Sequence, residues 1–179
     1  MFKGLKVLLV AVVFLAFSAD GLIGTAAPDW TNQRWINSGP LQLSLLRGKT
    51  VFIRFFMDSN CPLCRASAPH LNELYETYKD HGLVVIGMYT PKPEPRPTAT
   101  VLVQQFVKDY GFSFPVAVDD DWATLKKFWL DRVPAADYTS VSFLIDKKGV
   151  IQFIHSGGVY SKTDIVTIKK KIEELTSRR

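Results

Sequence analysis

Two cysteines separated by two residues, Cys61 and Cys64, stand between a strand-like run and a helix-like run. The preceding run, 50–57 (TVFIRFFM), is rich in β-branched and aromatic residues, which is typical of a strand buried on both faces. In the following run, 62–80, apolar residues recur with the spacing of one helix face. This junction favours a βαβ unit with both sulfurs at the start of a helix.

The position at a helix N-terminus has chemical consequences. Cys61 falls beside backbone N–H groups that lack intrahelical partners, and these groups and the helix dipole stabilise a thiolate. Cys64 lies one turn later, within disulfide reach. Pro62 suits the first turn because its missing N–H would have no partner there, and Arg65 adds a positive charge. We therefore expect Cys61 to be a reachable nucleophile and Cys64 the resolving thiol.

An inert structural disulfide is the simpler interpretation of the same pair. A four-residue loop restricts the unfolded chain very little, so such a bridge would add little stability. Two cysteines in 179 residues are too few for a disulfide-stapled scaffold or a zinc ribbon. The three histidines form no ligand spacing, so we expect no metal site. Redox chemistry is the favoured interpretation.

The charge balance restricts the possible partners. The net charge is +5, but the basic residues form no stripe, and their longest run is 169–171 on a predicted helix. A nucleic-acid partner is therefore not expected. With 47% hydrophobic residues, the chain has the composition and length of one globular domain, and we expect a monomer.

The first residues, 1–27, have the pattern of a secretory signal. Positive charges precede a mostly apolar stretch, 7–19, and Gly24 and Ala26 can occupy the two small-residue positions of a cleavage site. An uncleaved anchor is the alternative, although the apolar stretch is short for a membrane span. We expect an exported, periplasmic or otherwise extracytoplasmic domain over 28–179, in a compartment where paired thiols tend to be oxidised.

Strand-like and helix-like runs alternate along this domain. Strands are expected over 50–57, 83–89, 114–118, 140–145 and 150–155, and helices over 62–80, 101–110, 122–130 and 161–177. Four prolines alternate between 91 and 97, which excludes helix and ladder pairing and predicts a stiff loop. This order predicts an α/β fold with a mixed sheet.

The chain resembles the thioredoxin superfamily, and most closely the exported TlpA/ResA-type thioredoxin-like proteins, which overlap the broad redoxin family. The likeness runs from about Leu41 to Leu175 and is carried by short motifs: LRGK at 46–49, CPLCR at 61–65, Pro69, FPV at 114–116, Asp119, and SFLIDKKGVI at 142–151. It implies a three-layer α/β/α thioredoxin-like fold and a thiol–disulfide oxidoreductase without an organic cofactor. It also implies a protein disulfide client, such as an apocytochrome c, and a thiol electron donor at the membrane.

Several positions depart from the family pattern. Asn60 stands where relatives carry Trp, Ser67 where many carry an acid, and Phe55 where thioredoxin has a buried Asp, so the usual proton acceptor is not identifiable. Ser140 occupies the cis-proline position, and a trans bond is expected because a cis bond before a non-proline residue costs about 3 kcal/mol. In the family this loop faces the first cysteine, so Thr139 and Ser140 are expected to line the client groove.

Two other functions are compatible with this resemblance. A thiol peroxidase of the peroxiredoxin type needs Thr or Ser three residues, and Pro seven residues, before its cysteine, and this chain has Asp58 and Arg54 there. A Sco-like copper chaperone has one more residue between its thiols and a His near the position of Tyr138, although soft thiolates alone can hold Cu(I). Both remain alternatives to disulfide exchange, and the direction of electron flow stays open.

Overall fold

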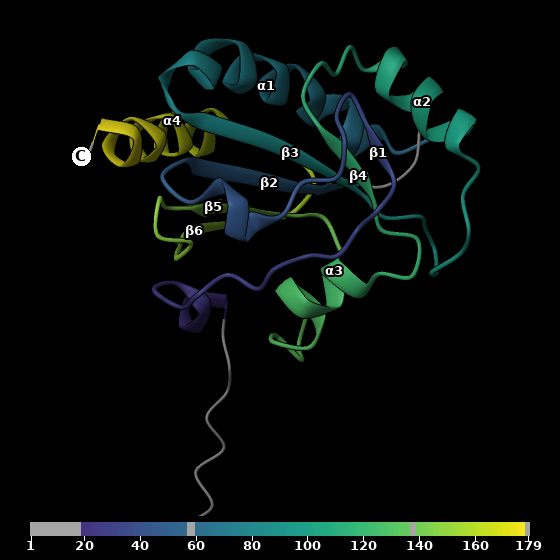
Figure 1. Ribbon diagram of the computed structural model, residues 1–179, viewed down its shortest axis with the longest axis horizontal. Helices are drawn as coiled ribbons and strands as arrows, with labels where there is room; N and C mark the ends of the chain where they lie inside the picture. The colour runs from purple at the N-terminus through teal and green to yellow at the C-terminus, as the bar shows by residue number, and fades with distance from the viewer. Residues whose placement is uncertain (1–18, 57–59, 137–138, 178–179) are drawn as a thin grey trace, which may run out of the picture.

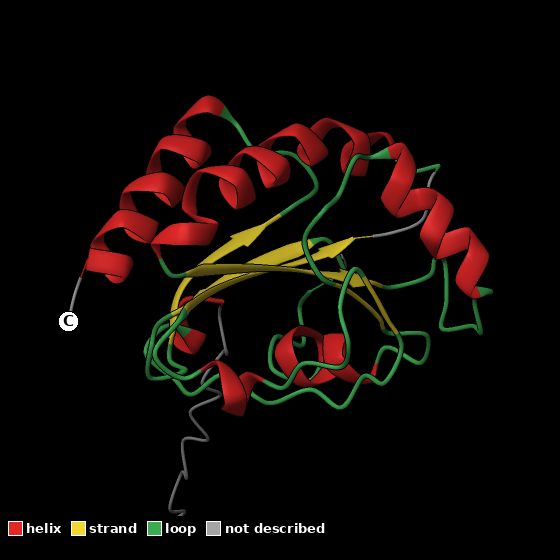
Figure 2. Ribbon diagram, turned by 45° about the horizontal axis from the view of Figure 1, so that its top comes forward, coloured by secondary structure: helices red, strands yellow, loops and turns green. Residues whose placement is uncertain are grey.

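The computed structural model describes residues 19–56, 60–136 and 139–177. They form a six-stranded sheet in the order β1-β4-β3-β2-β5-β6, with helices on both faces (Figure 1). Strands β2, β3 and β4 run parallel, whereas β1, β5 and β6 pair antiparallel with their neighbours. Figure 2 shows the sheet between the two helical layers. The predicted three-layer α/β/α architecture with a mixed central sheet is confirmed.

The elements have the following bounds. The strands are β1 (Trp35–Ile36), β2 (Thr50–Phe56), β3 (Leu83–Tyr89), β4 (Val116–Val118), β5 (Val141–Ile145) and β6 (Ile151–Ser156). The α-helices are α1 (Pro62–Tyr78), α2 (Thr100–Asp109), α3 (Ala123–Leu125) and α4 (Lys162–Ser177). Short 3-10 turns are η1 (Ala19–Leu22), η2 (Leu43–Leu46) and η3 (Lys79–His81), and η4 (Lys126–Leu130) is a π-helical turn.

Each expected element is found, and its ends lie within two residues of the predicted ones. Three differences from the prediction have a physical reason. The strand β4 begins at Val116 rather than at residue 114, after Pro115, which has no N–H to donate. The helix expected to begin at Trp122 begins one residue later, because Trp122 has a φ of 60° and lies in the left-handed region. The two-residue strand β1 was not predicted, because so short a segment carries no periodic signal.

The two faces of the sheet carry separate hydrophobic cores. On β2, Phe52 and Phe56 pack in the core under α1, α2 and α4, whereas Ile53 and Phe55 pack in the core toward η1, α3 and η4. This alternation follows from the period of two in a strand. Because helices cover both faces, the whole of β2 is buried, as its apolar composition predicted.

One edge of the sheet collects the segments that form the site. The parallel strands β2 and β3 end together there, with Phe56 in register with Tyr89. The antiparallel strand β5 begins at the same edge, since Arg54 of β2 is in register with Ser142. The α1 N-terminus, the loop after β3 and the loop before β5 therefore converge at this edge.

Residues 19–27, which we assigned to the signal segment, pack against β6. Leu22 is buried, the Gly24 N–H donates to the Ile151 carbonyl over 2.8 Å, and Ala26 forms an isolated bridge with Val150. Residues 1–18, the rest of the expected signal, lie outside the described residues. Over the described part of the chain, no helix combines the length and apolar composition needed to cross a membrane.

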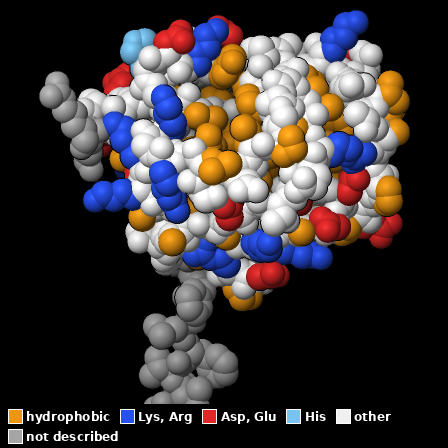
Figure 3. All heavy atoms as spheres, in the orientation of Figure 1, with side chains coloured by type: hydrophobic (Ala, Val, Ile, Leu, Met, Phe, Trp, Pro, Cys, Tyr) orange, Lys and Arg blue, Asp and Glu red, His pale blue; other side chains and the backbone are white. Residues whose placement is uncertain are grey.

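On the face shown in Figure 3, several Lys and Arg side chains gather at the left of the view and others lie along the lower edge, while Asp and Glu lie mostly at the upper left and lower right, around a more apolar centre. The predicted basic run, 169–171, lies on α4, where Lys169 pairs with Glu73 of α1.

Candidate active site

The two cysteines occupy the first turn of α1, as their spacing predicted. Cys61 is the N-cap residue with an extended backbone, and Pro62 is the first helical residue. The backbone N–H of Cys64 donates to the Cys61 sulfur over 3.1 Å, so the sulfur satisfies an N–H that has no partner within the helix. The two sulfurs are not joined in a disulfide. The Cys61 sulfur therefore caps the helix N-terminus, and Cys64 lies one turn behind it.

Cys61 is less exposed to solvent than the sequence predicted. Its side chain is only 5% exposed, and that of Cys64 is 3% exposed. Cys61 nevertheless lines a surface cavity of about 380 Å³ together with Asn60, Pro62 and Arg65. The cap position explains the low exposure, because the sulfur is turned back toward the helix N–H. Access to the Cys61 sulfur from the surface is therefore through this cavity.

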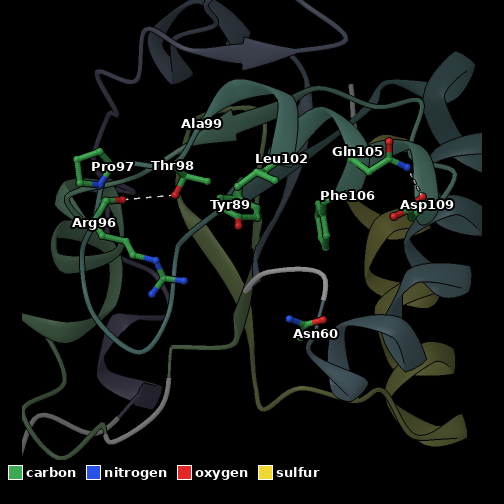
Figure 4. Close-up of a pocket in the computed structure, with 10 residues that line it drawn as sticks. All are labelled: Asn60, Tyr89, Arg96, Pro97, Thr98, Ala99, Leu102, Gln105, Phe106 and Asp109. Carbon is green, nitrogen blue, oxygen red and sulfur yellow. Dashed lines mark hydrogen bonds between the residues drawn. The ribbon is translucent and has the colours of Figure 1, made fainter.

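A second cavity of about 340 Å³ shares Asn60 with the first. Its other walls come from β3, the proline-rich loop and α2, and include Tyr89, Leu102 and Phe106. Figure 4 shows Asn60 on the opposite side of this cavity from Phe106. Asn60 therefore borders both this cavity and the one that Cys61 lines.

The cations near Cys61 come from two elements. Arg65 is exposed on α1 and forms a hydrogen bond with Tyr110, which opposes the burial that raises the pKa of that phenol. Lys92, in the loop after β3, is half-buried, and its ammonium lies 5.2 Å from the centre of the Trp122 ring. Burial lowers the pKa of Lys92, and negative charge on Cys61 acts in the opposite direction. Sequence reasoning identified Arg65 and missed Lys92.

Thr139 and Ser140 lie at the same sheet edge as the cysteines. The Ser140 carbonyl accepts a hydrogen bond from the Gly157 N–H over 2.8 Å. Both side chains are largely buried, and Thr139 Oγ1 has no hydrogen-bond partner among the described residues. The one cis peptide bond in the described segments is Lys92–Pro93, so the Thr139–Ser140 bond is trans, as expected.

A buried arginine lies under the site. Arg54, in the middle of β2, is 0% exposed. Its guanidinium donates to the Ser142 hydroxyl over 3.1 Å and to the carbonyls of Gly157 and Gly158 over 2.9 and 3.0 Å. It also lies 5.1 Å from the centre of the Tyr160 ring. A charged residue within an apolar strand was the available signal, and sequence reasoning used it only to argue against a peroxidase.

A histidine borders this cluster. His155 of β6 lies 3.4 Å from the Asp164 carboxylate, and its ring centre lies 4.8 Å from that of Tyr160. Burial lowers the pKa of His155 and outweighs the opposing effect of Asp164. Burial also raises the pKa of Tyr160, whose hydroxyl lies 2.6 Å from that of Ser142.

Ser67 and Phe55 stand at the two positions where the family resemblance implied a carboxylate. The Ser67 hydroxyl donates to the Cys64 carbonyl over 3.0 Å, one turn along α1. Phe55 lies on the opposite face of β2, in the core toward α3. Neither side chain can accept a proton from Cys64 as a carboxylate would.

Asp58 and Tyr138, which bear on the peroxidase and copper-chaperone alternatives, lie outside the described residues. Within the described segments, no group of three or more His, Cys, Asp or Glu side chains is arranged to hold a metal ion.

Comparison with known proteins gives this geometry its context. The AhpC/TSA family model matches residues 23–154. The thiol-disulfide oxidoreductase ResA of Bacillus thuringiensis subsp. konkukian is 32% identical over 84% of this chain and 78% of its own length. ResA of Halalkalibacterium halodurans is 32% identical over 66% of this chain, and the match spans 60% of that protein.

Solved structures agree with these matches. A putative protein disulfide isomerase from Bacteroides thetaiotaomicron superposes with a TM-score of 0.70 at 26% identity, covering 87% of this chain and 91% of that one. A putative thiol:disulfide interchange protein DsbE from Chlorobium tepidum gives a TM-score of 0.66 at 25% identity, covering 87% and 98%. The chain therefore belongs to the AhpC/TSA family, among its thioredoxin-fold thiol–disulfide oxidoreductases of the ResA type.

Proposed function

We propose that this protein exchanges disulfides with client proteins through Cys61 and Cys64. The Cys61 thiolate attacks one sulfur of a client disulfide, forms a mixed disulfide and releases the second client sulfur as a thiolate. Cys64 then loses its proton to solvent and attacks the Cys61 sulfur, which breaks the mixed disulfide and releases the first client sulfur as a thiolate; both client thiolates take up protons from solvent. The products are the reduced client and a Cys61–Cys64 disulfide, so two electrons have passed to the client. The same steps in reverse oxidise a client dithiol.

The observation that carries this proposal is the hydrogen bond from the Cys64 N–H to the Cys61 sulfur. It makes Cys61 the sulfur that faces the free N–H groups of α1, where an anion is favoured. It also keeps Cys64 next to the bond that it must attack. A structural pair would need no such difference between its two sulfurs.

The surroundings of Cys61 support a protein client. The cavity beside Asn60, Pro62 and Arg65 is the opening to the buried sulfur. On the other side, the segment of Thr139 and Ser140 lies at the same sheet edge, where an extended client chain can run along it. We propose that the protein works as a monomer outside the cytoplasm. In that compartment, a thiol donor at the membrane reduces the Cys61–Cys64 disulfide.

A Cys64→Ser variant tests the proposal directly. Without its resolving thiol, Cys61 should accumulate as a mixed disulfide with client proteins in the exported compartment. The adduct should be released by dithiothreitol and should be absent from the Cys61→Ser, Cys64→Ser double variant. A folded Cys64→Ser protein without any adduct would contradict client exchange.

Two further measurements separate the alternatives. Peroxide consumption by the reduced wild-type protein, at a rate comparable with dedicated peroxidases, would favour the peroxidase function. Tight Cu(I) binding that is lost in Cys61→Ser would favour the chaperone function. The disulfide exchange proposal predicts neither result.

A further inference from the structure

Arg54 is a buried cation whose described partners are all uncharged. A fully buried charge is costly unless a counter-charge or several hydrogen bonds compensate it. Here the compensation comes from the Ser142 hydroxyl, two glycine carbonyls and the face of the Tyr160 ring. Its Nε has no hydrogen-bond partner among the described residues. Arg54 is therefore a fully buried guanidinium held by neutral groups.

The position of this charge connects it to the thiols. Phe52 and Phe56, the residues two before and two after Arg54 on β2, share one packed cluster with Cys64 and Tyr160. By the alternation of the strand, Arg54 points into the same layer between the sheet and α1. The charge thus lies on the α1 side of the sheet, with Cys64.

The glycine turn held by Arg54 gives a second connection. A Cβ added to Gly158 would lie only 2.6 Å from the Leu63 Cβ, so this turn packs directly against the residue between the two cysteines. The neighbouring Gly157 holds the Ser140 carbonyl. Arg54 thus binds the turn that lies between the first turn of α1 and the expected client groove.

We propose that Arg54 is a positioning residue of the thiol pair, whose fixed positive charge stabilises negative charge on the cysteines. This inference rests on the proposed function and deepens it. A charge that stabilises thiolates stabilises the reduced pair relative to the disulfide and makes the couple more oxidising. In place of a carboxylate that accepts the Cys64 proton, this chain has a cation that favours its loss.

Other charged and titratable groups also face this region. His155, Tyr160 and Asp164 come from the sheet, the β6–α4 loop and α4. His70 and Arg65 come from α1. Tyr110 and Lys92 come from the end of α2 and the proline-rich loop. Of these, Asp164 is half-buried, accepts a hydrogen bond from the Ser161 N–H and pairs with His155. The test must therefore change the charge at Arg54 and nothing else.

The test is the equilibrium of the reduced protein with oxidised glutathione. One protein dithiol and one GSSG give one protein disulfide and two GSH, so electrons and protons balance. Four proteins are compared: wild type, Arg54→Gln, Arg54→Lys and Lys79→Gln. Glutamine is neutral but can still donate hydrogen bonds, lysine keeps the charge, and Lys79→Gln removes an exposed charge at the far end of α1. Because the chain has only two cysteines, alkylation and mass measurement report this pair alone.

We expect the equilibrium constant toward the protein disulfide to rise about tenfold in Arg54→Gln, which corresponds to about 30 mV for a two-electron couple. Arg54→Lys and Lys79→Gln should stay within about twofold of wild type. A folded Arg54→Gln protein with the wild-type constant would overturn the inference, and so would equal shifts in the Gln and Lys variants. If the wild-type protein forms no reversible disulfide, the proposed function itself fails.

A second measurement, made on a protein that retains Arg54, tests the inference if Arg54→Gln does not fold. In Cys61→Ser, which retains Arg54, the rate of iodoacetamide labelling of Cys64 is followed against pH. A midpoint clearly below about 8.5, the usual value for a free thiol, supports the inference. A midpoint at or above that value overturns it, because burial would then outweigh the charge.

Discussion

The backbone N–H of Cys64 donates to the sulfur of Cys61 over 3.1 Å, although the two side chains have almost the same exposed fraction, 3% and 5%. The two thiols therefore differ in electrostatic surroundings more than in burial. Cys61 lines a surface cavity, and Cys64 is not among the residues that line it. We infer that the two sulfurs differ strongly in reactivity.

The first prediction concerns labelling of the reduced, folded protein. Iodoacetamide should modify Cys61 at least about tenfold faster than Cys64, because the thiolate is the reacting form and Cys61 has both the helix N-terminus and the opening. Peptide mapping by mass spectrometry measures the two rates. In urea the difference should disappear. Equal rates in the native state would show that the cap hydrogen bond does not determine reactivity.

A second prediction follows from the burial of His155. Its folded pKa lies below the ordinary value of 6.5, so the unfolded chain binds more protons than the native one between the two values. The contribution of this group to stability is therefore complete above about pH 6.5 and is lost as the pH falls toward the folded pKa. The pKa of Asp164 lies below its ordinary value of 3.8, so this carboxyl titrates in a separate, more acidic pH range.

Urea titrations of wild type and His155→Gln between pH 7.5 and 5 check this prediction. The stability of the wild type relative to the variant should fall over this range, because glutamine does not titrate. The other histidines, His70 and His81, are common to both proteins and cancel in the comparison. A difference in stability that does not change with pH would contradict a lowered pKa for His155.

A third prediction concerns the contact between Gly158 and Leu63. An added Cβ at Gly158 would lie 2.6 Å from both Cβ and Cδ1 of Leu63, and the Cβ cannot rotate away. Gly158→Ala should therefore displace the first turn of α1 and destabilise the protein by about 1–3 kcal/mol. It should also reduce the rate of disulfide exchange.

Gly39→Ala is the matched control for this substitution. A Cβ at Gly39 meets no atom within 4 Å and needs no unusual φ. Chemical denaturation should show it to be close to wild type, within about 0.5 kcal/mol. If Gly158→Ala behaves in the same way, the turn does not restrain the cysteine helix.

The sequence predicted the order of elements because each is defined by a local pattern. The strand β2 was identified from its β-branched and aromatic run, and α1 from its apolar period. The cysteines were placed at the α1 N-terminus by the same local signals. The candidate catalytic pair could therefore be located without any tertiary information.

The surroundings of the pair could not be located in this way. Arg54 finds its partners Gly157 and Gly158 more than one hundred positions later in the chain, and no period connects them. Lys92 approaches Cys61 only because β3 ends beside β2. The low exposure of Cys61 depends on the direction of one N-cap side chain, which the residue type does not determine.

The last prediction concerns the segment before the expected domain boundary. Leu22 is 2% exposed in the core shared with α3 and η4, whereas its neighbour Ile23 is 43% exposed. Beside Leu22, the Gly24 N–H and the Thr25 carbonyl form hydrogen bonds with the backbone of Ile151 over 2.8 and 2.9 Å.

Leu22→Ala should therefore destabilise the protein by about 2–4 kcal/mol, because it leaves a cavity in a packed core. Ile23→Ala should cost less than about 1 kcal/mol, because its side chain remains partly in water. Urea denaturation of both variants decides the matter: equal midpoints would show that residues 19–27 do not belong to the folded unit, whereas a lower midpoint for Leu22→Ala alone would assign them to it.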